Sequence, residues 1–293
     1  MSTRAATTTQ AAPGLDRRTE LSKFLRSRRA RLKPEDVGLP SHGRRRVPGL
    51  RREELAQLAG VSFAYYVRLE QGYSDGVSAE VLHAVARVLR LSGPERAHLM
   101  RLAQPERQQT AHPAPRQRLR PAVEHLLNAL GVPAIVAGRR MDILGGNQLA
   151  ATVFGNWTPL PPEERSLPRL FFLSPTARER FADPARTAPA VVGILRLHIG
   201  KHPDDPHLAS LVGELTAKSE EFRRLWERHD VGCGNHDTIR MRHPLVGEYD
   251  LVPQPMTLDG DDDQRLLTYH AEPGSRSEEA LQMLACWETQ PVH

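Results

Sequence analysis

Little in this sequence favours secretion, membrane insertion or a disulfide-stabilised fold. Its 293 residues include two cysteines, Cys233 and Cys286, whose spacing is not that of a disulfide framework. No apolar run approaches the roughly 20 residues that cross a bilayer. The N-terminal stretch MSTRAATTTQAAPG also lacks an apolar signal core. We therefore expect a cytoplasmic protein with reduced thiols and no membrane partner.

Motifs of enzymes and metal sites are also missing. The sequence contains no glycine-rich phosphate loop, no GxSxG elbow and no HExxH helix. The stretch ERHDVGCGNHDTIRMRH holds His229, Cys233, His236 and His243, but it lacks the CxxC or HxxxH pairs typical of zinc sites. We therefore expect no catalytic residue, no metal and no cofactor.

Charge is divided unevenly between the two parts of the chain. Residues 1–120 carry 23 Lys and Arg against 11 Asp and Glu, a net charge of +12. The remaining residues carry 17 against 24, a net charge of −7. Basic clusters such as RSRRAR and RRRVPGLRR bind phosphates by releasing counterions, which makes nucleic acid the expected partner of the first part. A solvated basic surface, or self-association of the opposite charges, is the alternative.

Five short helices are predicted after a polar, disordered start at residues 1–16. Apolar residues recur at helical spacing in 21–32 and 50–59, and again in SFAYYVRLEQG, SAEVLHAVARVLRL and GPERAHLMRLA. Gly60 is suited to end the second helix, and Ser62 is a suitable N-cap for the third. Two helices joined by a tight glycine turn predict a helix-turn-helix domain, which we place at residues 17–103.

The third predicted helix has two different faces. At 100° per residue, Tyr66 and Leu69 point to one side, whereas Ala64 and Arg68 point to the other, with Phe63 at its flank. The first side is therefore expected to pack into the domain. The second side is left free to contact a partner.

A different pattern follows a polar, proline-rich linker predicted at residues 104–117. PAIVAGRRMDILGGN predicts a β-hairpin, and helices are expected in 149–154 and from 188 to about 229. TIRMRHP, EYDLVPQPMTL and RLLTYHAEP are expected strands before a last helix in SEEALQMLACW. Strands on both sides of a helical insert predict an α+β domain with an antiparallel sheet over residues 118–290.

Specific stretches of the sequence resemble a known family. LRREELAQLAGVSFAYYVRLEQG resembles the helix-turn-helix of the xenobiotic-response-element and Cro/phage-repressor family. Together with LVGELTAKSEEFRRLWERHDV and HPLVGEYDL, it is similar to the MmyB-like regulators of actinobacteria. The resemblance implies a five-helix DNA-binding domain followed by a PAS-like ligand-binding domain. It also implies a nucleoid-associated homodimer on a palindromic double-stranded DNA operator.

The resemblance assigns the DNA contacts to particular residues. Phe63, Ala64 and Arg68 occupy the positions that touch base edges, where Arg68 suits guanine and the other two suit a thymine methyl. Arg51 and Arg52 begin the helix that crosses the DNA backbone, where they add to its positive dipole end. The remaining expected DNA-contacting residues are Arg44, Arg45, Arg46, Ser62, Tyr65 and Tyr73.

The arginine run at residues 44–46 and the acidic Glu70 need separate interpretations. Arg44–Arg46 either track phosphates, which we favour, or enter a minor groove. Glu70 would repel phosphate unless it were neutralised, and Arg29 of the first helix is its expected partner.

A fatty-acid-like ligand is implied for the PAS-like domain, whose apolar cavity would suit it. Arg196, in the apolar run VVGILRLHIG, is expected to meet the ligand carboxylate, or alternatively to pair with Asp204 or Asp205. The other expected ligand contacts are Asn147, Phe222, Trp226 and His229.

We thus interpret the sequence as a ligand-responsive, sequence-specific transcription regulator. An enzyme tethered to a DNA-binding module and a scaffold without a small ligand are the alternatives. Turnover of a substrate would favour the tethered enzyme, and a C-terminal domain that binds no lipid would favour the scaffold.

Overall fold

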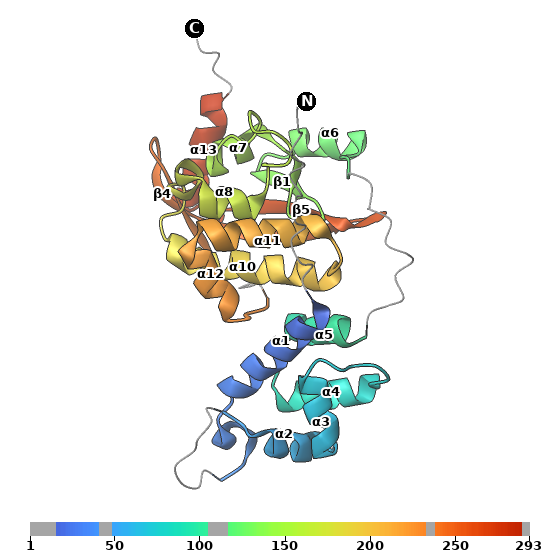
Figure 1. The fold of residues 1–293 in the computed structure, drawn as a ribbon. Coiled ribbons are helices and arrows are strands. Elements are labelled where there is room, and N and C mark those ends of the chain that lie inside the picture. The colour runs from blue at the N-terminus through green and yellow to red at the C-terminus, as the bar shows by residue number, and fades with distance from the viewer. Residues whose placement is uncertain (1–15, 41–48, 105–116, 233–237, 289–293) are drawn as a thin grey trace, which may run out of the picture.

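The computed structural model describes residues 16–40, 49–104, 117–232 and 238–288. These residues form an N-terminal helical region and a C-terminal α+β region, which lie end to end in Figure 1. The predicted disordered start, most of the linker, Arg44–Arg46, Cys233 and His236 lie outside the described residues.

Five α-helices build the helical region, as the sequence predicts. They are α1 (Arg17–Arg31), α2 (Arg52–Ala59), α3 (Phe63–Glu70), α4 (Ala79–Val88) and α5 (Gly93–Ala103), with a short 3₁₀ turn, η1 (Pro34–Val37), after α1. Side-chain caps fix several starts. Asp16 accepts hydrogen bonds from the backbone amides of Arg18 and Thr19, and Ser78 accepts one from Val81. The turn η1 was not predicted, because its PED sequence lies in a proline- and glycine-rich stretch without apolar periodicity.

One hydrophobic core holds these five helices together. It contains Leu21, Phe24 and Leu25 from α1, Tyr66 and Leu69 from α3, and further residues from α2, α4 and α5. Val231, from the α+β region, belongs to the same cluster. The core of the helical region therefore extends across the contact between the two regions.

The α+β region contains a five-stranded antiparallel sheet with the strand order β2-β1-β5-β4-β3. The strands are β1 (Ala134–Ala137), β2 (Ile143–Gly146), β3 (Ile239–His243), β4 (Gly247–Leu258) and β5 (Asp261–His270). The helices are α6 (Pro121–Ala129), α7 (Gln148–Phe154), α8 (Leu167–Leu173), α9 (Pro175–Arg178), α10 (Pro184–Lys201), α11 (Pro206–Lys218), α12 (Glu220–Glu227) and α13 (Arg276–Glu288). The antiparallel sheet and the β1–β2 hairpin confirm the predicted fold class.

Side-chain alternation gives the sheet two covered faces. Ile135 packs with α7 and α13 in one cluster, whereas its neighbours Ala134 and Val136 pack with α6 in another. A third cluster joins α8, α10, α11 and α12, which Figure 1 shows as a helical layer beside the sheet. This helical layer is the part of the α+β region that faces the helical region.

The long helical insert differs from the prediction. The segment expected as one helical stretch from residue 188 to about 229 is divided into α10, α11 and α12. Pro203 and Pro206 interrupt it after α10, and the Ser219 hydroxyl caps α12 by accepting a hydrogen bond from the Phe222 amide at 3.2 Å. The short helices α6, α8 and α9 were not predicted; each has a proline in its first turn, and proline is also a signal for turns and loops.

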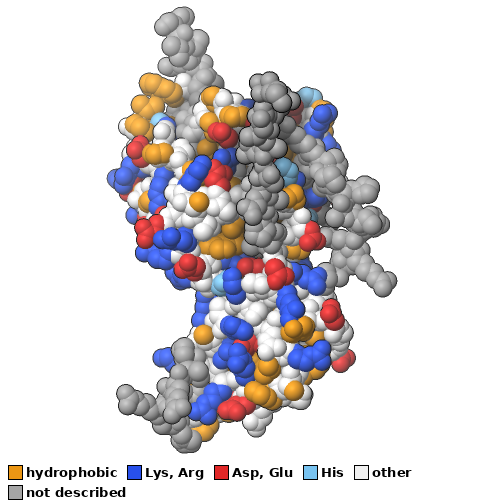
Figure 2. Space-filling view, in the orientation of Figure 1, with side chains coloured by type: hydrophobic (Ala, Val, Ile, Leu, Met, Phe, Trp, Pro, Cys, Tyr) orange, Lys and Arg blue, Asp and Glu red, His pale blue; other side chains and the backbone are white. Residues whose placement is uncertain are grey.

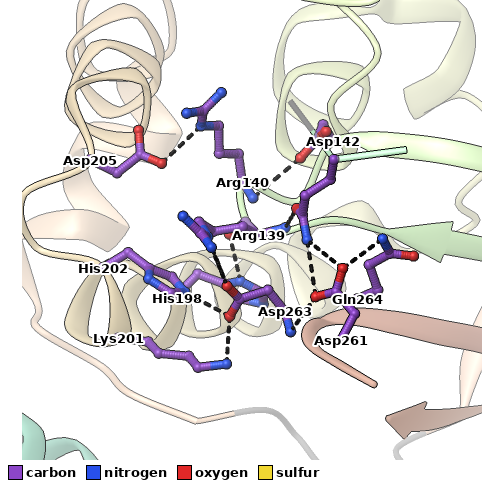
Figure 3. A network of polar contacts seen from close by, with 11 residues as sticks. Arg139, Arg140, Asp142, His198, Lys201, His202, Asp205, Asp261, Asp263 and Gln264 are labelled. Carbon is purple, nitrogen blue, oxygen red and sulfur yellow. Dashed lines mark hydrogen bonds and ion pairs between the residues drawn. The ribbon is translucent and has the colours of Figure 1, made fainter. Parts of the chain in front are cut away.

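A half-buried carboxylate connects α10 to the sheet (Figure 3). Asp263 of β5 accepts hydrogen bonds from Arg139 in the β1–β2 turn at 2.8 Å and from Lys201 of α10 at 2.6 Å. The ring of His202 lies 2.9 Å from the same carboxylate. Burial by itself would raise the pKa of Asp263, but these three partners outweigh it and hold the pKa well below its ordinary value.

Replacing this carboxylate should destabilise the α+β region. Asp263→Asn leaves two cations without their counter-ion, and we expect the free energy of unfolding at pH 7 to fall by about 2 kcal/mol. Because the folded pKa is depressed, the stabilisation is present above the unfolded pKa of about 4 and is lost as the pH falls below it. Urea unfolding of both proteins between pH 7 and pH 3 should therefore show their difference narrowing.

The matched control is Asp250→Asn, which removes a carboxylate paired with Arg240 at the surface. It should change stability by less than about 1 kcal/mol, since exposed ion pairs contribute little. Equal losses in the two variants would contradict a structural role for Asp263.

Candidate nucleic-acid interface and contact between the two regions

The helix-turn-helix is formed by α2 and α3. Gly60 ends α2 with a positive φ of 69°, a backbone conformation that glycine adopts without strain. The Val61 amide then donates to the Ala56 carbonyl at 3.0 Å, and the Ser62 hydroxyl accepts from the Tyr65 amide at 3.2 Å. The predicted glycine turn and serine cap are confirmed, and together they fix how α3 leaves the turn.

One face of α3 is left exposed, as its periodicity predicts. Phe63 is 55% exposed although it is a large aromatic residue, and Ala64 and Arg68 are exposed beside it. Tyr65 is half-buried and packs against the core that contains Tyr66. An exposed phenylalanine next to an arginine on a helix-turn-helix is suited to contact base edges.

Glu70, at the end of α3, is the buried acid of this region. It is fully buried and is reached by three arginines from two helices. Arg29 of α1 donates to it at 2.8 Å and 3.1 Å, Arg52 of α2 donates at 2.9 Å, and Arg26 lies at 3.6 Å. Arg29 was the predicted partner, and the structure confirms it.

Arg29 and Arg52 also set the protonation of Glu70. Burial would raise the pKa of this carboxyl, but the hydrogen bonds and charges of Arg29 and Arg52 outweigh it and lower the pKa below its ordinary value. Glu70 is therefore ionised at neutral pH. It holds Arg52 at the start of α2, where the guanidinium remains partly exposed.

Arg51 and Tyr73 also lie at the surface of this region. Arg51 is exposed at the N-cap of α2, where its amide donates to Glu54 at 2.7 Å. Tyr73 is exposed after α3, and the guanidinium of Arg18 lies 3.3 Å from the centre of its ring. Tyr73 therefore contacts α1, a role that the sequence did not suggest.

The residues expected to bind a ligand fall into two places. Asn147 caps α7, accepting hydrogen bonds from the amides of Ala134 and Ala150, and donates to the carbonyls of Leu130 and Val132. Its amide group is thus engaged in holding the ends of β1 and α7. Phe222, Trp226 and His229, in contrast, come together with Arg196 where the α+β region meets α1.

Arg196 joins the two regions. It is 1% exposed, and its Nη1 donates to the Glu20 carboxylate of α1 at 2.7 Å. The same nitrogen lies 3.0 Å from Nδ1 of His229, which must accept because arginine carries no acceptor. Burial lowers the pKa of Arg196 to about 10, so the side chain stays charged at neutral pH.

The surroundings of Arg196 differ from the predicted ion pair with an aspartate. Its guanidinium lies over the Trp226 ring at 3.7 Å and donates to the Trp226 carbonyl, so α12 closes one side of it. The predicted pairing with Asp204 or Asp205 is wrong, because Asp205 pairs with Arg140 at 2.8 Å and Glu20 takes the place beside Arg196. Sequence reasoning missed Glu20 because it lies 176 positions away in another domain.

A second group of ion pairs lies beside Arg196. Arg28 of α1 donates to the His229 carbonyl at 2.8 Å and pairs with Glu95 of α5 at 2.9 Å. Arg31 pairs with Asp230, which follows α12. In Figure 2, acidic, basic and histidine side chains gather at the waist where the two regions meet.

Close backbone approach accompanies these charges. A Cβ added to Gly200 of α10 would lie 2.4 Å from the His98 ring of α5, too close for any side chain. His98 is itself 2% exposed, and burial lowers its pKa to about 3, so the ring is neutral at physiological pH. Buried charge pairs, shared core residues and glycine contact together hold α1 and α5 in a defined position against α10 and α12.

The histidine-rich stretch does not gather ligands in the described part of the chain. His229 follows α12 and faces α1, whereas His243 ends β3 and accepts a hydrogen bond from the Leu245 amide at 3.3 Å. Within the described residues, no group of three or more His, Cys, Asp or Glu side chains is arranged to hold a metal ion. Among the described helices, none has both the length and the apolar character of a bilayer span.

Two family models match the chain. Residues 20–99 match a helix-turn-helix domain, and residues 119–284 match the ligand binding domain of MmyB-like transcription regulators. The second match alone covers more than half of the 293 residues. No curated protein matches the chain.

The buried position of Glu70 leads to a prediction about the helix-turn-helix. Glu70→Gln keeps the shape of the side chain but leaves three arginines without their counter-ion, and we expect a loss of about 2–3 kcal/mol in the free energy of unfolding. Glu53→Gln is the control, since Glu53 is exposed and its ion pair with Arg51 is a surface contact of 3.6 Å. Urea unfolding at pH 7 measures the stability of both variants. If Glu70→Gln lost as little stability as Glu53→Gln, the buried Glu70 would not be important for the stability of the helix-turn-helix.

Proposed function

Because the chain belongs to the MmyB-like transcription regulators, we propose that it is a ligand-responsive regulator that binds a specific double-stranded DNA operator. In this proposal, residues 17–103 bind DNA and residues 118–290 form a PAS-like domain that senses a small apolar or amphipathic ligand. The five-stranded antiparallel sheet, with helices on both faces, supports the PAS-like description.

The exposed face of α3 supports the DNA contacts. Phe63, Ala64 and Arg68 lie together on a helix whose opposite side is buried, so they are presented at the surface on a rigid element. Arg51 and Arg52 lie at the N-terminus of α2, where the helix dipole adds to their charge at a phosphate. In our proposal α3 enters the major groove and α2 crosses the backbone.

We propose that the protein acts as a homodimer on a palindromic operator. A single helix-turn-helix makes few base contacts, and two copies on half-sites about one helical turn apart supply the missing specificity. A change in the orientation of the helix-turn-helix relative to the ligand-binding domain would alter the spacing of the two copies. The operator affinity would change with it.

The single observation that carries the regulatory part is the contact between Arg196 and Glu20. This ion pair is buried and connects the ligand-binding domain to α1, the helix that also holds Glu70 and thereby α3. A ligand that shifts α10 or α12 must therefore strain or break a charge pair that also positions the DNA-binding domain. Coupling of about 1–3 kcal/mol between two such sites is ordinary.

Fatty-acid-like molecules are the ligand class that we propose for the sensing domain. Arg196, the residue that the sequence predicts to meet the ligand carboxylate, already has Glu20 as its counter-ion. In our proposal it therefore transmits the response, while the carboxylate binds elsewhere in the domain.

Arg68 should determine which sequence is bound. Arg68→Ala is expected to cost about 1–3 kcal/mol on the operator, first obtained by selection from random sequences, and little on unrelated DNA. Arg224→Ala is the control, because Arg224 is exposed on α12 and its loss changes the net charge equally. Gel-shift titrations on both DNAs distinguish a base contact from a phosphate contact. An equal loss of affinity for operator and unrelated DNA would show that Arg68 contacts phosphate only.

Glu20 should be required for the ligand response. We expect decanoate to change the operator affinity of the unaltered protein about five-fold or more, and Glu20→Gln to reduce that change to less than two-fold. Glu214→Gln is the control, since Glu214 pairs with Arg169 and Lys218 inside the ligand-binding domain. Operator titrations with and without decanoate measure the effect. A full response in Glu20→Gln would contradict coupling through this contact.

A further inference from the structure

An open cleft lies on the ligand-binding domain, between α9 with the segment that follows it and the end of β3. Its volume is about 690 Å³, and its walls include Pro175, Arg178, Arg180, Phe181, Arg242 and Pro244. The segment pairs with β3, since the Arg242 amide donates to the Arg180 carbonyl at 2.7 Å and the Ala182 amide to the Arg240 carbonyl at 2.9 Å. The cleft is thus built on the edge of the sheet and not on a free loop.

Three arginines line this cleft, and they are not equivalent. Arg178 pairs with Glu221 at 2.6 Å, and Arg242 pairs with Glu248 at 2.7 Å. Arg180, which is half-buried, makes no ion pair with any described residue, and its Nη1 is buried without a hydrogen-bond acceptor among them. Leaving a guanidinium nitrogen without an acceptor costs free energy, so Arg180 is a cation of the cleft lining whose charge and hydrogen-bonding capacity the described residues do not satisfy.

The two titratable groups whose pKa the charge of Arg180 affects, Tyr249 and His243, are uncharged at neutral pH. Tyr249 of β4 is 3% exposed, and its hydroxyl has no partner among the described residues. Burial raises the pKa of Tyr249 to about 12, although the charge of Arg180 opposes this, so the hydroxyl stays protonated and can donate. Burial and the charge of Arg180 both lower the pKa of His243, which keeps that ring neutral. Among the charged residues that line the cleft, Arg180 and Glu179 thus pair with no described residue, and they differ in burial, since Arg180 is half-buried whereas Glu179 is exposed to solvent.

Phe181 separates the cleft from the interior. Its ring is half-buried and packs against two hydrophobic clusters, one between the sheet and α7 and one among α8, α10, α11 and α12. It lies 4.9 Å from the ring of Phe171 and 6.4 Å from the ring of Phe154. Phe181 is therefore the residue of the cleft lining that reaches both clusters.

We propose that this cleft is the entry and head-group site for an amphipathic anion, with Arg180 as the principal anion-binding residue. The acidic group lies against Arg180 at the mouth, near Arg178 and Arg242, and the apolar chain follows the position of the Phe181 ring into the interior. This inference rests on the proposed function, since it gives the sensed ligand a place and a charge.

Aromatic contacts connect this site to the DNA-binding domain. Each ring in the series lies 4.9–5.5 Å from the next, and the last is covered by Arg196; the series is Phe181, Phe171, Phe172, Phe222 and Trp226. Close-packed rings cannot move independently. A ligand chain that displaces Phe181 is therefore expected to shift α12 and the contact of Arg196 with Glu20.

The first test uses the full chain and three probes with the same ten-carbon tail. Isothermal titration should show decanoate binding at least about ten-fold more tightly than decanol, because the carboxylate adds a charge-assisted hydrogen bond that the alcohol lacks. Decyltrimethylammonium, which carries a positive charge, should bind more weakly than decanol. Equal affinities for the three probes would overturn the anion site, and this comparison needs no altered protein.

The second test uses substitutions at the cleft. Arg180→Gln should lower the decanoate affinity about ten-fold and leave decanol binding unchanged, whereas Arg223→Gln, at an exposed position of α12, should change neither. Arg180→Lys, which keeps the positive charge, should retain part of the decanoate affinity. Unchanged decanoate binding in Arg180→Gln would show that the anion binds elsewhere.

Operator titrations separate this inference from the proposed regulation. Decanoate binding that depends on Arg180 but leaves operator affinity unchanged would refute the regulation and support the site. An operator response to decanoate that persists in Arg180→Gln would refute the site and support the regulation. The expected result is that binding and response are lost together in that variant.

Discussion

The buried ion pair between Arg196 and Glu20 determines how the two domains of this protein are arranged. A guanidinium that is 1% exposed requires an acceptor at close range, and Glu20 of α1 supplies it from the other domain. Separating the domains would leave Arg196 beside the Trp226 ring without its counter-ion. The helix-turn-helix is therefore not attached to the ligand-binding domain by a linker alone. It is also joined by a charge pair, by Val231 in its core and by the approach of Gly200 to His98.

The basic residues of the first domain serve more than one purpose because of this arrangement. Arg28 and Arg31 bind acids and carbonyls at the contact with the ligand-binding domain, and Arg29 and Arg52 bind the buried Glu70. A net charge of +12 in the first 120 residues therefore overstates the charge that is free to meet phosphates. On the helix-turn-helix itself, Glu70 connects α3 to Arg29 of α1 and to Arg52 of α2, whose guanidinium stays partly exposed.

The ligand-binding domain has a related organisation, in which few polar groups hold apolar layers in place. Asp263 connects the end of α10 to the sheet through Arg139 and Lys201, and Asn147 fixes the start of α7. Between these points, Phe181 and Leu167 pack against both the cluster at the sheet and the cluster of the helical layer. The polar contacts thus fix the ends of these elements, and packed aromatic rings fill the space between them.

The sequence by itself determined the elements whose signals are local. The glycine turn at Gly60, the Ser62 cap, the exposed face of α3 and the β1–β2 hairpin follow from spacing and from backbone preference within a few residues. The pairing of Arg29 with Glu70 was also predictable, because an acid on a DNA-facing helix needs a cation nearby. Only the tertiary structure decided the partner of Arg196 and the position of the cleft around Arg180. Glu20 lies 176 residues from Arg196, and no periodicity or motif reports which distant side chains folding brings within 3 Å.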